Sequence, residues 1–257
     1  MFAVCFLAVA PSLQAQDMMR HVDLTSPEMT ESEFTRAEIE RLIAQAREGV
    51  LDLSGKRLSG MDLSGLNLRG VNLRLARLNK TKLIAADLSG GNLDQAWALG
   101  ADFSDAKLVR TSLFAMQARA AVFARSDLTD ARLVSDLTGA DLTDANLSGL
   151  RGGADMKNQS MGLIRAILNS AKLDGANLAR ADLSRAKLEF ASLAGVNLTE
   201  ATLVGAELAG ADLTGAQMTG ADLRNADVSG AKLRTLIGQQ AAKNVDQLVN
   251  GDRALRN

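Results

Sequence analysis

The stretch Ala171-Lys-Leu-Asp-Gly-Ala-Asn-Leu-Ala-Arg-Ala-Asp-Leu-Ser-Arg185 decides the fold of this 257-residue chain. It holds three copies of one five-residue unit, in which alanine comes first, a polar residue second and leucine third. Leucine or phenylalanine returns at nearly every fifth position from Leu53 to Leu93, and again from Leu168 to Leu233. A short unit that repeats this regularly predicts a solenoid.

The period of five fits neither an α-helix, which repeats every 3.6 residues, nor a strand, which repeats every two. It fits a chain that turns a corner after each unit, so that four units close a square coil. Successive coils would then stack at the spacing of neighbouring strands, about 4.8 Å. Leucine would fill the axis, and alanine would occupy the places where the wall lies too close for anything larger.

The two phenylalanines at central positions test this register within the sequence. Phe103 and Phe123 are twenty residues apart, so the square coil predicts that they stack. The central residues one unit before them, Ala98 and Ala118, are also twenty apart and small. Close packing requires such pairing of large with small side chains on adjoining walls.

The units ADLSG (86–90), AKLDG (171–175) and ANLAR (176–180) resemble the pentapeptide repeat family, whose consensus is A-(D/N)-L-x-x. The resemblance covers residues 50–236. It implies an all-β solenoid, specifically a right-handed quadrilateral β-helix. Some members of that family mimic the DNA duplex and bind a type II topoisomerase, and in some a C-terminal helix mediates dimers.

The N-terminus predicts export. An apolar run at 2–10 is followed by Pro11 and small or polar residues, which is typical of a signal peptide over 1–15 with cleavage after Ala15. A buried apolar N-terminal segment is the alternative. Cleavage would remove Cys5, the only cysteine, which suits an oxidising compartment. We therefore expect a periplasmic or secreted protein, and a cytoplasmic one if this segment is not a signal peptide.

Short helices are expected on both sides of the repeats, as caps for the exposed ends of the solenoid. Residues 16–49 form an acidic leader and a helix, in which Thr35 and Glu38 make a capping box and Phe34 and Ile39 a hydrophobic staple. Residues 237–257 are predicted as a helix and tail, because the apolar residues of 239–250 share one helical face. A partner-binding or homodimerising helix is the alternative at this second end.

The repeat loses its phase once. Leu133 is followed one residue early by Leu137, and the original phase returns at Leu168. Between them the unit is poorly kept over 149–166. This irregular segment is either a bulge or a protruding loop.

No catalytic, cofactor-binding or metal-binding residues emerge. His21 is the only histidine and lies in the leader, which argues against His-based metal sites and Ser–His pairs. Glycines such as Gly55 fall at one corner position, where a turn needs a positive φ. Aspartates such as Asp87, Asp102, Asp182 and Asp212 precede a central leucine, where they are expected to hydrogen-bond the backbone of the corner. We expect no enzyme and no small-molecule substrate.

Four apolar residues occupy positions that should point outward: Trp97, Val109, Phe114 and Val134. Together they would form an exposed patch, and such patches often mark contacts with partners. The alternative is that the irregular segment or the N-terminal helix folds over them.

Charge is uneven along a chain whose net charge is −1. Residues 50–82 hold seven basic and two acidic residues, a balance of +5, whereas 200–230 hold one and five, a balance of −4. This polarity favours one-ended docking or head-to-tail association, unless it is merely solvated surface. Over 50–237 there are 22 basic and 20 acidic residues, so the rod lacks the acidity of a DNA mimic, and no pattern points to nucleic acid.

The sequence thus favours a non-enzymatic scaffold or protein-binding module with an unknown protein partner. The alternative is a DNA-mimicking modulator of a type II topoisomerase such as DNA gyrase. That alternative comes from the family resemblance alone.

Overall fold

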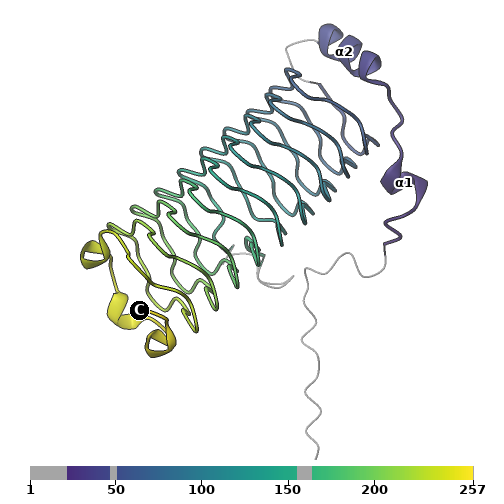
Figure 1. Cartoon of the computed structure of the whole chain (residues 1–257). Coiled ribbons are helices and arrows are strands. Elements are labelled where there is room, and N and C mark those ends of the chain that lie inside the picture. Colours follow the sequence, from purple (N-terminus) through teal and green to yellow (C-terminus); the bar gives the residue numbers. More distant parts are fainter. Residues whose placement is uncertain (1–21, 47–50, 155–163, 257) are drawn as a thin grey trace, which may run out of the picture.

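The computed structural model describes residues 22–46, 51–154 and 164–256. The proposed signal peptide 1–15, with Cys5, and His21 lie outside these residues. Within the described residues, the repeats wind into coils that stack into one long body (Figure 1). No helix in these three ranges is long and apolar enough to cross a membrane.

Parallel bridges between residues twenty apart join each coil to the next, as in Asp52–Asn72 and Arg57–Arg77. Each coil has four such bridging positions, and the central leucine follows each of them. We number the four walls by the leucines of the first coil: Leu53 lies in wall 1, Leu58 in wall 2, Leu63 in wall 3 and Leu68 in wall 4. Each corner is named by the two walls that it joins. The predicted step of twenty residues is therefore present.

Each corner is a turn closed by the backbone. In the first coil, the N–H of Lys56 donates to the carbonyl of Leu53 (3.2 Å), and Gly55 lies between them with φ 67°. Asp52 accepts a bond from the N–H of Ser54 (3.0 Å), which orders the start of the corner. The same aspartate contact recurs at Asp87, Asp102, Asp182 and Asp212. The roles predicted for corner glycines and aspartates are confirmed.

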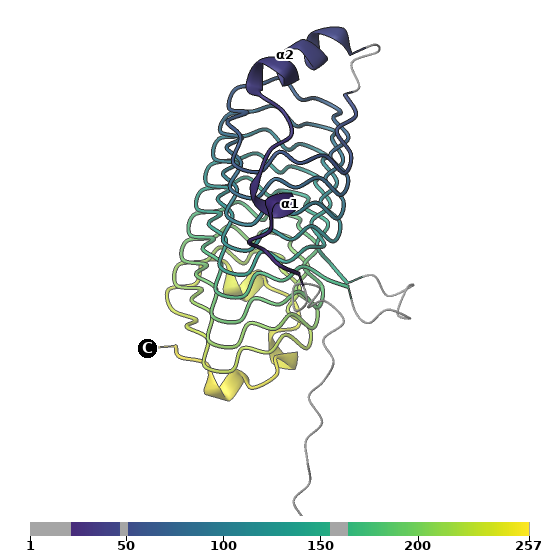
Figure 2. The same cartoon turned by 90° about the vertical axis from the view of Figure 1, so that its right-hand side faces the viewer.

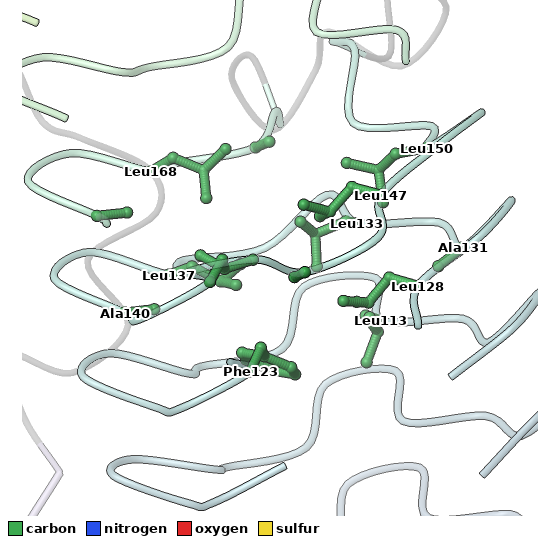
Figure 3. Packing of buried hydrophobic residues seen from close by; sticks show 14 of the residues in the cluster. Leu113, Phe123, Leu128, Ala131, Leu133, Leu137, Ala140, Leu147, Leu150 and Leu168 are labelled. Atoms are coloured by element: carbon green, nitrogen blue, oxygen red, sulfur yellow. The ribbon is translucent and has the colours of Figure 1, made fainter. Parts of the chain in front are cut away.

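The core is the column of central side chains along the axis, and it is closed to solvent (Figure 3). Phe103 and Phe123 stack as predicted, with ring centroids 4.7 Å apart and planes 2° from parallel. Ala98 and Ala118 beside them are also fully buried. Large and small residues on adjoining walls therefore share the available volume.

The N-terminal segment contacts the first coils. Helix α2 (Arg36–Gln45) begins at the predicted capping box of Thr35 and Glu38, and its Ile39 is fully buried in the core cluster. Before it, helix α1 (Pro27–Thr30) lies against the side of the stack (Figure 2). Met29 of α1 is 5% exposed, and its carbonyl accepts a bond from the Asn79 side chain (3.0 Å).

The α-helix predicted over 239–250 is wrong. The chain over 239–253 instead forms three short 3₁₀ helices, η3 (Gln239–Ala241), η4 (Val245–Gln247) and η5 (Gly251–Arg253). Gly238, Asn244 and Asn250 precede them in the left-handed conformation, at φ 70°, 57° and 55°, and interrupt any helical path. Wall bridges at Ile237, Lys243, Val249 and Leu255 show that the chain instead makes a coil with six residues per unit.

The loss of phase is confined to one corner. The bridge Gln117–Asp136 spans nineteen residues, so the corner between Leu133 and Asp136 is one residue short. One coil later, Asp136 bridges Ile167, a step of thirty-one, so the extra residues lie between Gly152 and Ile167. Both changes fall at corner 1–2, while the walls before and after continue. Of the irregular segment 149–166, residues 155–163 lie outside the described ranges.

Candidate protein-binding surface

The structure places three of the four predicted patch residues around corner 1–2. Phe114 and Val134 follow one another up this corner, because the N–H of Ala115 donates to the carbonyl of Val134 (2.8 Å). Trp97 lies on adjoining wall 2, between the bridging partners Arg77 and Gln117. Val109 instead follows the wall 4 residue Leu108, so it sits at corner 4–1, one corner before the others.

The exposure predicted for Val134 is wrong. Val134 is only 5% exposed, because it lies in the corner that is one residue short. Its neighbour Ser135 takes the inward place, where the hydroxyl donates to the carbonyl of Leu113 and accepts from the N–H of Met116. Trp97, Val109 and Phe114 are each partly exposed. Whether these residues contact a partner stays a prediction.

The ring of Phe114 has a cation on one face. The guanidinium of Arg132, from the next coil of wall 1, lies 4.1 Å from the ring centroid. A stacked guanidinium of this kind gains from the ring quadrupole, and its N–H groups still point outward in its own plane. Below the ring, Asp94 accepts a bond from the N–H of Phe114 (3.0 Å) and one from Ser112 Oγ (2.5 Å).

Leu75 belongs to this surface and was missed by the sequence reasoning. It lies at corner 1–2 one coil before Asp94, with its N–H donating to the Asp94 carbonyl (3.0 Å). It is 42% exposed and has φ 61°. The signal in the sequence was a leucine at the unit position that holds Gly55 in the first coil.

The charge around corner 1–2 is positive. Arg74 lies on the corner, Arg57 and Arg77 on wall 2, and Arg132 on wall 1, and none of them makes an ion pair with another residue that the structure describes. The neighbouring carboxylate of Asp136 is already paired with Arg119 (2.6 Å). The arginine charges are therefore not compensated locally.

The carboxylates of the rod serve its structure. Hydrogen bonds from the Lys232 ammonium and the Thr214 hydroxyl lower the pKa of Asp212 from 3.8 to about 2. The backbone N–H of Ser54 is the main cause of the lowered pKa of Asp52. Such carboxylates remain ionised and are poor proton donors near neutral pH. Across the described ranges, no cluster of three or more His, Cys, Asp or Glu residues could hold a metal ion.

These features define the class as a repeat protein of stacked coils, with a shortened corner and the exposed residues Leu75 and Phe114 at corner 1–2. A family model described as pentapeptide repeats matches with 8 copies, over residues 52–79, 163–199 and 191–230. The resemblance to the pentapeptide repeat family seen in the sequence is therefore confirmed over these residues.

Similar solved structures are also pentapeptide repeat proteins. HetL, described as involved in heterocyst differentiation regulation in the cyanobacterium Nostoc sp. strain PCC 7120, is 25% identical, with 86% of this chain and 94% of that chain covered and a TM-score of 0.42. Full-length QnrB1, a plasmid-mediated fluoroquinolone resistance protein, is 17% identical, with 81% and 92% covered and a TM-score of 0.36. Rfr23 from the cyanobacterium Cyanothece 51142 is 30% identical, with 46% and 64% covered and a TM-score of 0.23. No curated protein matches significantly.

Proposed function

We propose that this chain is a non-enzymatic protein-binding module, in which a rigid rod presents one irregular edge to a protein partner. The observation that supports this most is the gathering of Leu75, Trp97 and Phe114 around corner 1–2, where the repeat also loses its phase. In the regular walls and corners, backbone hydrogen bonds and corner aspartates already satisfy the polar backbone groups. The rod itself is proposed to be the right-handed quadrilateral β-helix of its family, with α2 as the cap of its first coil.

The test is affinity purification from a native extract of the source organism, with quantitative comparison of variants. The double variant Trp97→Ala, Phe114→Ala should lose a specific partner that the intact chain retains. Gln217→Ala, an exposed change on wall 4, is the matched control and should retain it. Retention of every partner by the double variant would contradict a role for this edge.

Export is part of the proposal and is motivated by the apolar segment at 2–10. Fractionation of the source cells followed by N-terminal sequencing tests it directly. A mature chain that begins at Gln16 in an extracytoplasmic fraction is the expected result. An intact N-terminus in the cytoplasm would contradict it.

Mimicry of DNA is the competing hypothesis, and the charge of the rod opposes it. A mimic needs an acidic surface along its length, whereas the first coils carry uncompensated arginines and the repeats are close to neutral. A gyrase supercoiling assay separates the two hypotheses. Inhibition or drug protection at micromolar protein would favour mimicry over the module proposed above.

A further inference from the structure

Leu75 and Phe114 at corner 1–2 and Trp97 on the adjoining wall 2 are called the ridge. Leu75, Trp97 and Phe114 come from three successive coils, so at strand spacing the ridge extends only about 10 Å along the rod. Because they are neighbours on one convex edge, a single extended segment can contact all three. This length corresponds to about three residues of extended chain.

Leu75 is unfavourable for the isolated rod. A left-handed backbone costs energy for any residue that has a Cβ, as Leu75, Gln95 and Ala115 do at this corner, whereas glycine takes it freely, as Gly55 does in the same place one coil earlier. The leucine side chain is also 42% exposed, so the free protein gains little from burying it. A partner that covers the ridge would give this side chain an environment that the rod does not.

The arginines around the ridge select the charge of the partner. Arg74 precedes Leu75 in the chain, and Arg77 is the bridging partner of Trp97 in the preceding coil. Arg132 covers one face of Phe114 at 4.1 Å. Since Arg132 is already stacked, its N–H edges are held in a fixed plane, which suits bidentate binding of a carboxylate. Of the carboxylates at this edge, Asp136 is paired with Arg119, and Asp94 accepts a hydrogen bond from Ser112.

The chain itself shows how an acidic segment binds next to this edge. The leader runs along the stack (Figure 2), with an antiparallel bridge between Ser32 and Leu58 of wall 2. Glu33 pairs with the backbone of Arg57, accepting through Oε1 (2.9 Å) and donating through its N–H (3.0 Å). One apolar side chain, Met29, is buried as an anchor. This end of the rod therefore already binds one extended segment that carries acidic residues and an apolar anchor.

Single-stranded nucleic acid fits the ridge less well. Binding of bases relies on open aromatic faces as stacking platforms. One face of Phe114 is occupied by Arg132, and in the wall Trp97 lies between its bridging partners Arg77 and Gln117.

We propose that the corner surface formed by Arg74, Leu75, Arg77, Trp97, Phe114 and Arg132 binds an extended acidic segment of a partner protein that carries apolar side chains between its carboxylates. This inference rests on the proposed function and names the chemistry of its partner. The apolar residues of the segment cover the ridge, and its carboxylates pair with the arginines.

The experiment uses the full chain and a synthetic peptide of alternating glutamate and leucine, labelled for fluorescence anisotropy. Trp97 is the only tryptophan, so its emission reports directly whether the peptide reaches this surface. We expect saturable binding that shifts the emission of Trp97. We also expect binding to weaken at least about tenfold when ionic strength rises from about 0.05 to about 0.5 M, because exposed charge pairs are screened.

Two matched variants test the ridge. Leu75→Gly removes an exposed apolar side chain from a left-handed position, and Phe190→Gly does the same at corner 2–3, where Phe190 is 71% exposed with φ 57°. Leu75→Gly should weaken peptide binding about tenfold, and Phe190→Gly should leave it unchanged. Arg132→Gln, compared with Arg180→Gln at corner 4–1, tests the charge in the same way.

Three outcomes would overturn the inference. Equal binding of a lysine–leucine peptide would show that charge is not recognised. Equal effects of Leu75→Gly and Phe190→Gly would show that the ridge is not the site. Tighter binding of oligo-dT than of the acidic peptide would assign the surface to nucleic acid. If the acidic peptide fails while Trp97→Ala, Phe114→Ala still abolishes capture of a native protein, the module function stands and only this partner chemistry is wrong.

Discussion

Compensation between Phe103 and Ala98 is the sharpest test of how the core is packed. The two residues are consecutive central residues in one coil, on walls 3 and 2, and both are fully buried. Phe103→Leu loses the stacking on Phe123 and part of its volume, which should lower the free energy of unfolding by about 1–2 kcal/mol. Ala98→Leu adds three carbons to a closed core and should cost about 1–3 kcal/mol.

The double variant is expected to recover much of this loss. Phe103→Leu opens space next to the place where Ala98→Leu needs it, and leucine at both central positions is the arrangement of the second coil, at Leu78 and Leu83. The two changes should therefore couple by at least about 1 kcal/mol, as contacting residues do. Urea unfolding followed by circular dichroism measures the four proteins, with coincident transitions by a second probe as the check on two-state behaviour.

A distant pair provides the control. Leu203→Ala removes a buried leucine five coils beyond Ala98, and its cost should simply add to that of Ala98→Leu. Additivity within about 0.5 kcal/mol for the Ala98 and Phe103 pair as well would refute the reasoning. It would mean that large and small residues on adjoining walls do not share volume.

Three further predictions follow from single side chains. Lys232 lowers the pKa of Asp212 from 3.8 to about 2, so the contribution of Asp212 to folding stability is present above the unfolded pKa and is lost as pH falls through the folded pKa. Since both side chains are partly exposed, Asp212→Asn should cost about 1 kcal/mol of unfolding free energy at neutral pH. A pH series of urea melts should show this difference vanish between about pH 4 and pH 2. Phe190→Gly removes a mostly exposed ring and at the same time relieves a strained left-handed position. The free energy of unfolding should therefore fall by no more than about 0.5 kcal/mol, and a larger loss in thermal unfolding would show that the ring of Phe190 packs better than its exposure indicates. Ile39→Ala should lower the free energy of unfolding by about 2–4 kcal/mol, and it should speed amide exchange in the first coil more than near Leu203. An equal increase in exchange along the whole rod would contradict a capping role for α2.

The regular part of the fold could be predicted because its information is local. Each unit carries its own leucine, its own corner aspartate and its own left-handed position, so a period of five residues determines wall, corner and core together. The stacked rings of Phe103 and Phe123 followed from counting alone. The capping box of α2 is likewise a signal within four residues.

The predictions from the sequence failed where the same residues fit two different arrangements. The apolar residues of 239–250 match a helical face, but they also match units of six, and the left-handed Asn244 and Asn250 decide for the coil. Both side chains donate to corner aspartates of the preceding coil, Asp222 (2.7 Å) and Asp227 (2.9 Å). This tertiary contact cannot be seen in the segment itself. Homodimerisation through a C-terminal helix therefore loses the helix on which it rested.

The position of the irregular residues is the strongest clue to function. In a stacked coil, a corner can shorten or lengthen without disturbing the walls, because the wall bridges resume on either side, as Arg132–Arg151 and Asp141–Lys172 do here. Independent accidents would therefore be spread over all four corners. Here the shortened turn at Val134, the insertion after Gly152, the strained Leu75 and the arginine-covered Phe114 all fall at corner 1–2. Phe190 at corner 2–3 and Val109 at corner 4–1 are single residues elsewhere on the rod. One constraint acting along one edge explains why four such features fall at corner 1–2, and a partner lying along that edge is such a constraint.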